Sequence, residues 1–307
     1  MSLFYNTESL VKAGSKLATA VINGERAEAW YEIRYQSDAD GQHTGRRVDE
    51  SNLFGLYDHP ESGIQDAEAK EVLQMYTAHR EQIRNYEANH AQDFPAGGTT
   101  GIDFQMIGAK TPLLQTYAQF AGAPSIDGEV LVGSDSKQDT FDLQPVSIPG
   151  VPAYHFDLSK NDLMVGEGGH DFLRGRGGAD VLHGGAGDDR LVGDTGNDFL
   201  FGGAGFDTYV YSTGDGVDRI EDSDATGAIF VNGQMLVGGI KKAGHTDWTS
   251  PDGAIKYEMS GTDLVVRLNG RQVMTVNENF QSGQFGVRLL DCFGQGDARR
   301  AMERIAA

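Results

Sequence analysis

The chain has 307 residues, 39% of them hydrophobic, which is enough for two or three domains and at least one apolar core. Its formal net charge of -20 argues against a nucleic-acid partner and fits the binding of cations. The only cysteine, Cys292, excludes an intrachain disulfide, and no run of about 18 apolar residues predicts a membrane span. The N-terminal residues lack the basic-then-apolar pattern of a signal peptide.

Residues 1–125 are predicted to form a helical region. Three segments read as short amphipathic helices: TESLVKAGSKLATAVI, GERAEAWYEIRYQS and TGRRVDESNLFGLY. Residues 96–108 read as a loop, and residues 111–122 as a helix with a proline near its start. A longer helix is predicted at about residues 64–90 from apolar residues spaced along one face: Ile64, Val72, Tyr76, Ile83 and Tyr86.

A shorter pattern lies at residues 27–57. An aromatic-rich helix is followed there by a segment with six characteristic positions: Gly45, Arg46, Arg47, Asp49 or Glu50, Leu53 and Phe54. This pattern resembles the closing helices of phage-type muramidases, which implies a lysozyme-like remnant in residues 1–57. In that family the catalytic Glu, Asp and Thr lie upstream, and no such triad with the family spacing is present in this sequence. We therefore expect this chain to be the C-terminal part of a longer protein.

Other catalytic motifs are also missing from the sequence. The G-x-S-x-G turn of serine hydrolases and the H-E-x-x-H helix of zinc proteases do not occur. His170 and His183 are predicted to be solvated, Cys292 to be a packed thiol and Trp30 to belong to a helical core. We therefore assign no catalytic residue and no organic cofactor.

A nine-residue period follows a connector, residues 126–156, in which EVLVGS and DTFDL read as short strands. A degenerate copy, DLSKNDLMV, precedes five full copies: GEGGHDFLR, GRGGADVLH, GGAGDDRLV, GDTGNDFLF and GGAGFDTYV. The first and fourth positions of the full copies are always glycine, and the sixth position is aspartate in the degenerate copy as well. Residues 157–224 are therefore predicted to be one repetitive domain.

The period predicts half a coil per copy. Glycine permits a tight turn, and the triplet after each aspartate is a short strand whose central residue points inward. Copies two apart then stack, at a strand spacing of about 4.8 Å, so their aspartates repel unless a cation lies between them. With the turn carbonyls they form cages of hard oxygen atoms, which suit Ca²⁺. About four ions are predicted, one in each gap of the two aspartate columns: 162–180, 180–198, 171–189 and 189–207.

The copies resemble the GGxGxDxUx nonapeptides of haemolysin-type (RTX) proteins, which form calcium-bound parallel β-rolls. In that family the carbonyls of the first four turn positions and the sixth-position aspartate bind the metal. Glu167, Arg176 and Asp194 depart from glycine at the second position, where ligation is through the carbonyl. The resemblance assigns these metal-site residues: Asp162, Asp171, Asp180, Asp189, Asp198, Asp207, Gly166, Gly168, Gly169, Gly175, Gly177, Gly178, Gly184, Gly185, Gly187, Gly193, Gly196, Gly202, Gly203 and Gly205.

The period ends in the acidic segment 214–224. Its Asp215, Asp218 or Asp222 could cap the last turn or hold another ion, or the segment could be a solvated loop. Residues 225–307 are predicted to be a β cap with two Asn-Gly hairpins, AIFVNGQMLV and DLVVRLNGRQVMTV, and a further strand, FGVRLLD. The RTX resemblance also implies a type I secretion signal near the C-terminus, for which DARRAMERIAA is the candidate.

The predicted fold class is α+β and multidomain: a helical N-terminal region, a calcium-bound parallel β-roll and a C-terminal antiparallel β cap. The leading function is a secreted, extracellular calcium-binding RTX protein, exported by a type I secretion apparatus, whose roll folds on Ca²⁺ and carries or displays the helical region. One alternative is a peptidoglycan hydrolase of the lysozyme type, or a fragment of one, with an RTX secretion module. Another is an adhesin that binds a bacterial or host cell surface.

Overall fold

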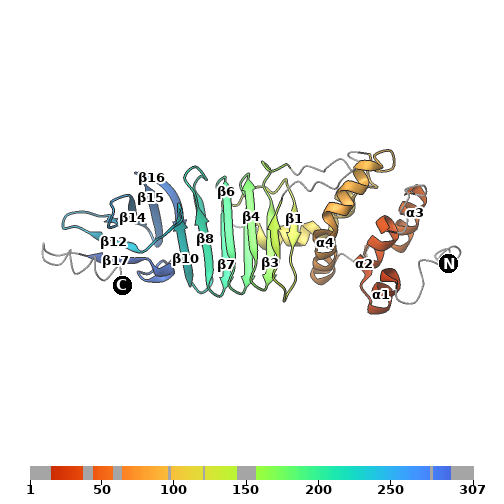
Figure 1. The fold of residues 1–307 in the computed structure, drawn as a ribbon, viewed down its shortest axis with the longest axis horizontal. Coiled ribbons are helices and arrows are strands. Elements are labelled where there is room, and N and C mark those ends of the chain that lie inside the picture. The colour runs from red at the N-terminus through yellow and green to blue at the C-terminus, as the bar shows by residue number, and fades with distance from the viewer. Residues whose placement is uncertain are drawn as a thin grey trace. The chain divides into compact units, whose positions relative to one another are not determined.

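The computed structural model describes residues 15–36, 44–57, 64–95, 98–119, 122–143, 157–276 and 279–291. These residues fall into two compact units, which divide between Thr116 and Tyr117 (Figure 1). The first unit is helical, and the second contains all the described strands. Cys292 and the candidate secretion signal lie outside the described residues. Within the described ranges, no helix combines the length and the hydropathy needed to cross a bilayer.

The first unit begins with α1 (Lys16–Asn23), which Ser15 caps by accepting a 3.2 Å hydrogen bond from the N–H of Ala18. The region predicted to be a loop, residues 96–108, contains α5 and the start of α6, so that prediction was wrong. The N–H of Ile102, at the start of α5, donates to the Glu87 carboxylate at 2.8 Å, a distant contact that no local pattern reveals. The helices are α1 (Lys16–Asn23), α2 (Arg26–Tyr31), the π-helix η2 (Glu32–Gln36), α3 (Thr44–Phe54), α4 (Asp66–Asn89), α5 (Ile102–Gln105) and α6 (Ile107–Tyr117).

A buried guanidinium organises the core of the helical unit. Arg34 lies 4.8 Å from the ring centroid of Trp30, which is fully buried as predicted. The same guanidinium donates hydrogen bonds to the Ser51 hydroxyl, at 2.6 Å, and to the Thr100 carbonyl. Three separate segments are therefore joined at one side chain. A small apolar cluster completes the packing: Leu17, Ala20, Ala29 and Ile33, with Phe54 against it.

Two parallel sheets form the repetitive part of the second unit (Figure 1). Successive strands alternate between the sheets, so partners within the repeats are 18 residues apart, as Asp162 and Asp180 are. One sheet runs β1 (Val130–Val132), β3 (Leu163–Gly168), β5 (Val181–Ala186), β7 (Phe199–Ala204) and β9 (Asp218–Glu221). The other runs β2 (Thr140–Asp142), β4 (Phe172–Gly177), β6 (Arg190–Thr195), β8 (Asp207–Tyr211) and β10 (Gly227–Val231).

The inward side chains stack into rows between the two sheets. Met164 pairs in register with Leu182, and Leu182 with Leu200, and all three are at most 2% exposed. Leu131 of β1 and Phe141 of β2 extend these rows, because each pairs in parallel with the first full strand of its sheet. The strands of the predicted connector thus belong to the same coil as the repeats.

The C-terminal block continues the first sheet, because β16 pairs in parallel with β9. Both predicted Asn-Gly hairpins are confirmed: β10 pairs antiparallel with β11, and β15 with β16. Asn269 and Gly270 have the positive φ angles that a two-residue hairpin turn requires. The remaining elements are β11 (Gln234–Met235), β12 (Gly238–Lys241), β13 (Trp248–Thr249), β14 (Ile255–Ser260), β15 (Asp263–Leu268), β16 (Arg271–Val276), η4 (Gln284–Gly286) and β17 (Arg288–Asp291).

Candidate metal centre

The sixth-position aspartates stack in two columns, one along each row of turns. In one column the backbone N–H of Asp162 donates to Oδ1 of Asp180 at 2.7 Å, and that of Asp180 donates to Oδ1 of Asp198 at 2.8 Å. Each carboxylate therefore fixes the turn of the preceding coil through its backbone. The same bond, at 2.7 and 2.8 Å, joins the members of the other column: Asp171 to Asp189 and Asp189 to Asp207.

Oδ2, the second carboxylate oxygen of these aspartates, does not accept such a hydrogen bond. All six aspartates are buried, with at most 2% of each residue exposed. Oδ2 has no hydrogen-bond partner among the described residues in five of them: Asp171, Asp180, Asp189, Asp198 and Asp207. An ionised carboxylate that is buried without compensation is strongly unfavourable. The same deficit at five equivalent positions means that each of these carboxyl groups must either hold a proton or bind a cation.

The unpartnered oxygen faces the first-position glycine of its own turn. A Cβ built on Gly166 would lie 2.4 Å from Oδ2 of Asp171 and 2.5 Å from the carbonyl oxygen of Gly184. A Cβ built on Gly184 would lie 2.4 Å from Oδ2 of Asp189 and 2.7 Å from the carbonyl oxygen of Gly202. A carboxylate oxygen and a carbonyl oxygen of the next coil thus converge on one space, which any side chain would fill. At the other first positions, a Cβ would likewise lie within 2.2 Å of Oδ2 of the aspartate in the same turn: Gly175, Gly193 and Gly202.

Glycine at the fourth position is required by the stacking of the coils. Gly187 has φ 133°, and a Cβ there would lie 1.5 Å from the carbonyl oxygen of Gly169 in the preceding coil. No rotamer removes a clash with backbone, so no other residue fits this position. The remaining fourth positions make equivalent contacts, within 2.2 Å: Gly169, Gly178, Gly196 and Gly205.

The second position tolerates larger residues despite its left-handed backbone. Glu167, Arg176 and Asp194 have φ angles of 74°, 78° and 60° there. The side chain of Arg176 pairs with Asp142 at 2.6 Å, and Asp194 pairs with Arg174 at 2.5 Å, so neither charge is left uncompensated. Gly185 and Gly203 take the same left-handed conformation, and the third-position glycines pack on carbonyls of the preceding coil: Gly168 on Asp135 and Gly177 on Leu158.

Burial raises the pKa of four of the column carboxyls well above the usual range. Loss of solvation, reinforced by neighbouring carboxylates, raises the pKa of Asp180 to about 9 and that of Asp207 to about 7. The pKa of Asp198 rises to about 7 and that of Asp171 to about 6 for the same first cause. In the absence of a cation the columns therefore hold protons at pH values where an exposed aspartate is ionised.

The columns extend beyond the repeats at both ends. Before the first repeat, the N–H of Asp139 donates to Oδ1 of Asp171 at 2.7 Å, while Oδ2 of Asp139 accepts from the N–H of Ser134 at 2.6 Å. After the last repeat, the N–H of Asp198 donates to Oδ1 of Asp218 at 3.2 Å. Burial raises the pKa of Asp218 to about 8, as it does in the columns. These two aspartates thus occupy column positions that the nine-residue period does not identify.

The acidic segment after the repeats is therefore not a solvated loop. Asp218 ends one column, and Asp222, only 9% exposed, accepts a 2.7 Å hydrogen bond from the Tyr209 hydroxyl. Oδ2 of Asp215 accepts a hydrogen bond from the N–H of Ser212, within the turn between β8 and β9. Asp222 accepts from the N–H of Ala225 in the following turn, which leads into β10, so Asp222 caps the last turn of the coil, as one of the sequence interpretations proposed.

A second ladder of hydrogen bonds follows the fifth position of the repeat. Oδ1 of Asn161 accepts from the N–H of Ala179 at 2.6 Å, and Nδ1 of His170 accepts from the N–H of Asp188 at 2.8 Å. This role was not predicted, although a polar fifth position in most copies is a signal for it. His183 is not solvated as predicted: its ring stacks on Phe201 at 4.2 Å, and burial lowers its pKa to about 4.

The donor set fits a hard divalent cation with several oxygen ligands. Each turn offers one unpartnered carboxylate oxygen together with backbone carbonyls, which is the ligand chemistry of Ca²⁺. In the part of the chain that the structure describes, no three His, Cys, Asp or Glu side chains converge to hold a metal by themselves. Any ion in the columns must therefore take much of its coordination from the backbone.

In the helical unit, Oε1 of the buried Glu32 also lacks a hydrogen-bond partner among the described residues, but this oxygen does not recur in a stacked column. Burial raises the pKa of Glu87, and this side chain accepts hydrogen bonds from the Tyr35 hydroxyl, at 2.7 Å, and from the N–H of Ile102. Glu87 therefore joins α4 to α5 and is engaged in structure. Asp49 lies exposed on α3, where Arg47 and Phe54 are half-buried, and the burial of the other muramidase-like positions, Gly45, Arg46, Glu50 and Leu53, lies outside what the structure describes.

The comparison with known protein families agrees with this geometry. The sequence model of the RTX calcium-binding nonapeptide repeat, which spans four copies, matches residues 158–191, 174–209 and 183–220. No curated protein matches the chain. The matched residues cover the turns in which the unpartnered carboxylate oxygens lie. The stacked coils of residues 158–220 are RTX calcium-binding nonapeptide repeats.

Proposed function

We propose that the two aspartate columns bind Ca²⁺ and that the coil is a calcium-bound parallel β-roll. The observation that carries this proposal is the buried, unpartnered Oδ2 at five equivalent turns. A Ca²⁺ ion at each turn would supply the missing positive charge and accept the nearby carbonyl oxygens as ligands. The ligands are the sixth-position aspartates and the carbonyls of the glycine-rich turn positions.

The number of ions follows from the number of gaps between stacked aspartates. The six repeat aspartates leave four gaps, two in each column. Asp139 and Asp218 each add one gap between two aspartates, at opposite ends, in which the same backbone-to-carboxylate bond is present. The N–H of Glu129 makes this bond to Asp162 as well, but the residue before that gap is not an aspartate. We therefore propose four ions within the repeats and one further ion at each flanking gap.

Calcium binding and folding would be one process in this region. Without a cation, the coil must bury carboxylates and order glycine-rich turns, both of which disfavour folding. Binding free energy then contributes directly to folding free energy. RTX repeats are typical of secreted proteins, and sites of this kind in extracellular modules fill at about 10⁻⁴–10⁻³ M Ca²⁺. The roll would stay unfolded during export through a type I apparatus and fold outside, where it displays the helical unit.

Limited proteolysis across a Ca²⁺ titration tests this proposal. The expected result is cooperative protection of residues 157–231 by Ca²⁺ and little protection by the same concentration of Mg²⁺, which demands a tight octahedron and releases water reluctantly. Full protection in chelator, or equal protection by Mg²⁺, would contradict the proposal. Mass spectrometry of the fragments assigns the cleavage sites, so that cleavage in the helical unit is not mistaken for unfolding of the roll.

A further inference from the structure

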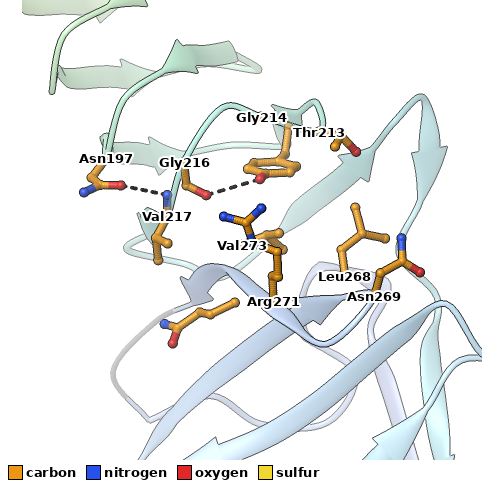
Figure 2. Close-up of a pocket in the computed structure, with 11 residues that line it drawn as sticks. Asn197, Thr213, Gly214, Gly216, Val217, Leu268, Asn269, Arg271 and Val273 are labelled. Atoms are coloured by element: carbon orange, nitrogen blue, oxygen red, sulfur yellow. Dashed lines mark hydrogen bonds between the residues drawn. The ribbon is translucent and has the colours of Figure 1, made fainter.

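A pocket of about 400 Å³ lies where the turn between β8 and β9 meets the C-terminal block (Figure 2). Thr213, Gly214, Gly216 and Val217 of this turn form one wall, and the hairpin between β15 and β16 forms the other. Pockets of this size are large enough for a small organic ligand. The pocket is separate from the aspartate columns, since it is lined without any of the column carboxylates.

The turn that forms one wall is held by three contacts. The Tyr211 hydroxyl donates to the carbonyl of Gly216 at 3.2 Å, and Oδ1 of Asn197 accepts from the N–H of Val217 at 2.8 Å (Figure 2). A Cβ on Gly216 would lie 1.6 Å from the carbonyl oxygen of Gly196, so the turn stacks tightly on the preceding coil. The wall is therefore formed before any ligand arrives, which lowers the entropy lost on binding.

The charge of the pocket differs from that of the whole chain. The protein carries a formal charge of -20, yet no Asp or Glu lines this pocket. Arg271 does, and Figure 2 shows it extending from the hairpin toward the turn that carries Gly216. This guanidinium makes no hydrogen bond or ion pair with any residue that the structure describes. Four other arginines of the same unit are each paired with a carboxylate: Arg174, Arg176, Arg219 and Arg267.

The rest of the lining combines apolar surface with amide donors. Val217, 40% exposed, Leu268 and Val273 offer apolar surface beside the guanidinium. The amide nitrogen of Asn197 and the side chain of Asn269 are the neighbouring polar groups, and neither is engaged within the described residues. A ligand that fits must present an anionic group to Arg271 and an apolar body to the wall.

We propose that this pocket binds a small organic monocarboxylate with an apolar ring or chain. A guanidinium matches a carboxylate with two parallel hydrogen bonds, a geometry that gives orientation as well as affinity. One cation compensates one negative charge, whereas a phosphate dianion would leave excess charge in an acidic protein. This ligand site goes beyond the proposed calcium function, and it uses different side chains.

Saturation-transfer NMR on the full chain in saturating Ca²⁺ tests the proposal with benzoate as the probe. Benzoate is expected to receive saturation, while benzamide, a neutral molecule of nearly the same shape, receives little. Phenyl phosphate distinguishes the anion class: binding tighter than that of benzoate would overturn the assignment of a carboxylate. Equal signals from benzoate and benzamide, or no benzoate signal at all, would also overturn it.

Two variants assign the binding to the pocket. Arg271→Gln should raise the dissociation constant of benzoate about tenfold or more, because a charged hydrogen-bonding partner is lost. Arg190→Gln is the matched control: Arg190 is exposed on β6, where its guanidinium lies over Phe172, away from the pocket, so binding should be unchanged. Unaltered binding in Arg271→Gln would refute the site. Calcium-dependent protease protection, measured on the same samples, separates failure of this site from failure of the calcium proposal.

Discussion

The backbone N–H of Asp189 donates a 2.8 Å hydrogen bond to Oδ1 of Asp207, in the next coil of the same column. Oδ2 of Asp207 is buried and has no such partner among the described residues. One carboxylate thus has two separable roles, because one oxygen organises the backbone while the other is available to a cation. Substitution by asparagine keeps an oxygen for the first role and removes the charge needed for the second.

Asp189→Asn should therefore weaken calcium binding more than it disturbs the coil. Asp189 borders two gaps, toward Asp171 and toward Asp207, so the variant is expected to lose up to two of the tightly bound ions in isothermal titration. Asp263→Asn, at the half-buried start of β15 and outside the columns, is the control and should bind the full number. Identical stoichiometry in both variants would show that the columns are not the ligands. Asp222 is a poor control because the Tyr209 hydroxyl donates to it.

Gly187→Ala should destabilise the calcium-loaded coil by about 3 kcal/mol or more, since it adds backbone strain and a clash with backbone. A Cβ at this position would lie 1.5 Å from the carbonyl oxygen of Gly169. Gly244→Ala provides the comparison: its φ is 82°, but nothing lies within 4 Å of its Cβ, so only the strain of about 1–2 kcal/mol remains. Thermal unfolding in saturating Ca²⁺ measures both. Similar melting temperatures for the two variants would mean that the coils are not stacked this closely.

The calcium-free coil should become less stable as pH rises. An unfolded aspartate has a pKa of about 3.9, whereas burial raises the folded pKa to about 6 for Asp171, about 7 for Asp198 and Asp207, and about 9 for Asp180. As pH rises, these aspartates therefore lose their protons at a lower pH in the unfolded chain than in the folded coil. The stabilisation is fully present below the unfolded pKa and is lost progressively as pH rises through the folded values.

Circular dichroism in chelator at pH 5.5 and pH 8.5 measures this dependence, and more β signal is expected at the lower pH. In Ca²⁺ the trend should reverse, because protons compete with the cation for the same oxygens and binding weakens as pH falls. A calcium-free coil that gains structure as pH rises would refute the assignment of raised pKa values.

The helical unit should keep its structure in chelator. Its core consists of apolar and aromatic contacts around Arg34 and Trp30, and the Glu87 carboxylate already accepts two hydrogen bonds. Removal of Ca²⁺ at pH 8.5 should therefore reduce the β component of the far-ultraviolet spectrum and leave the helical component. A parallel loss of both components would show that the two units fold as one.

The repeat made the register of the coil predictable. Glycine at positions one and four, aspartate at position six and an apolar eighth position define both the turn and the inward side chain, so the pairing of Met164 with Leu182 follows directly. The hydrogen bonds from each aspartate N–H to the next carboxylate did not follow, because spacing alone does not say which oxygen faces the backbone.

The ends of the coil were harder to predict, because their spacing departs from the period. Asp218 follows Asp198 by 20 residues, and Asp139 precedes Asp171 by 32, yet both occupy column positions. The sequence did contain a signal for strand β1, the first strand of the coil. VLVG at residues 130–133 matches LMVG at 163–166, and these segments pair in register. The start of α5, by contrast, is fixed by a hydrogen bond to Glu87, which lies 15 residues before Ile102 and so outside any short sequence pattern.

Because strands alternate between two sheets, whether the number of repeats is even or odd decides which sheet each end strand joins. β9 receives its partner β16 on one sheet, and β10 receives β11 on the other. Removing a single nonapeptide would move each of these strands to the opposite sheet, so the C-terminal block would meet the wrong edge. Removing two would preserve both edges and shorten the coil by one complete turn. Arrays of this design can therefore gain or lose repeats without refolding their ends only in even steps.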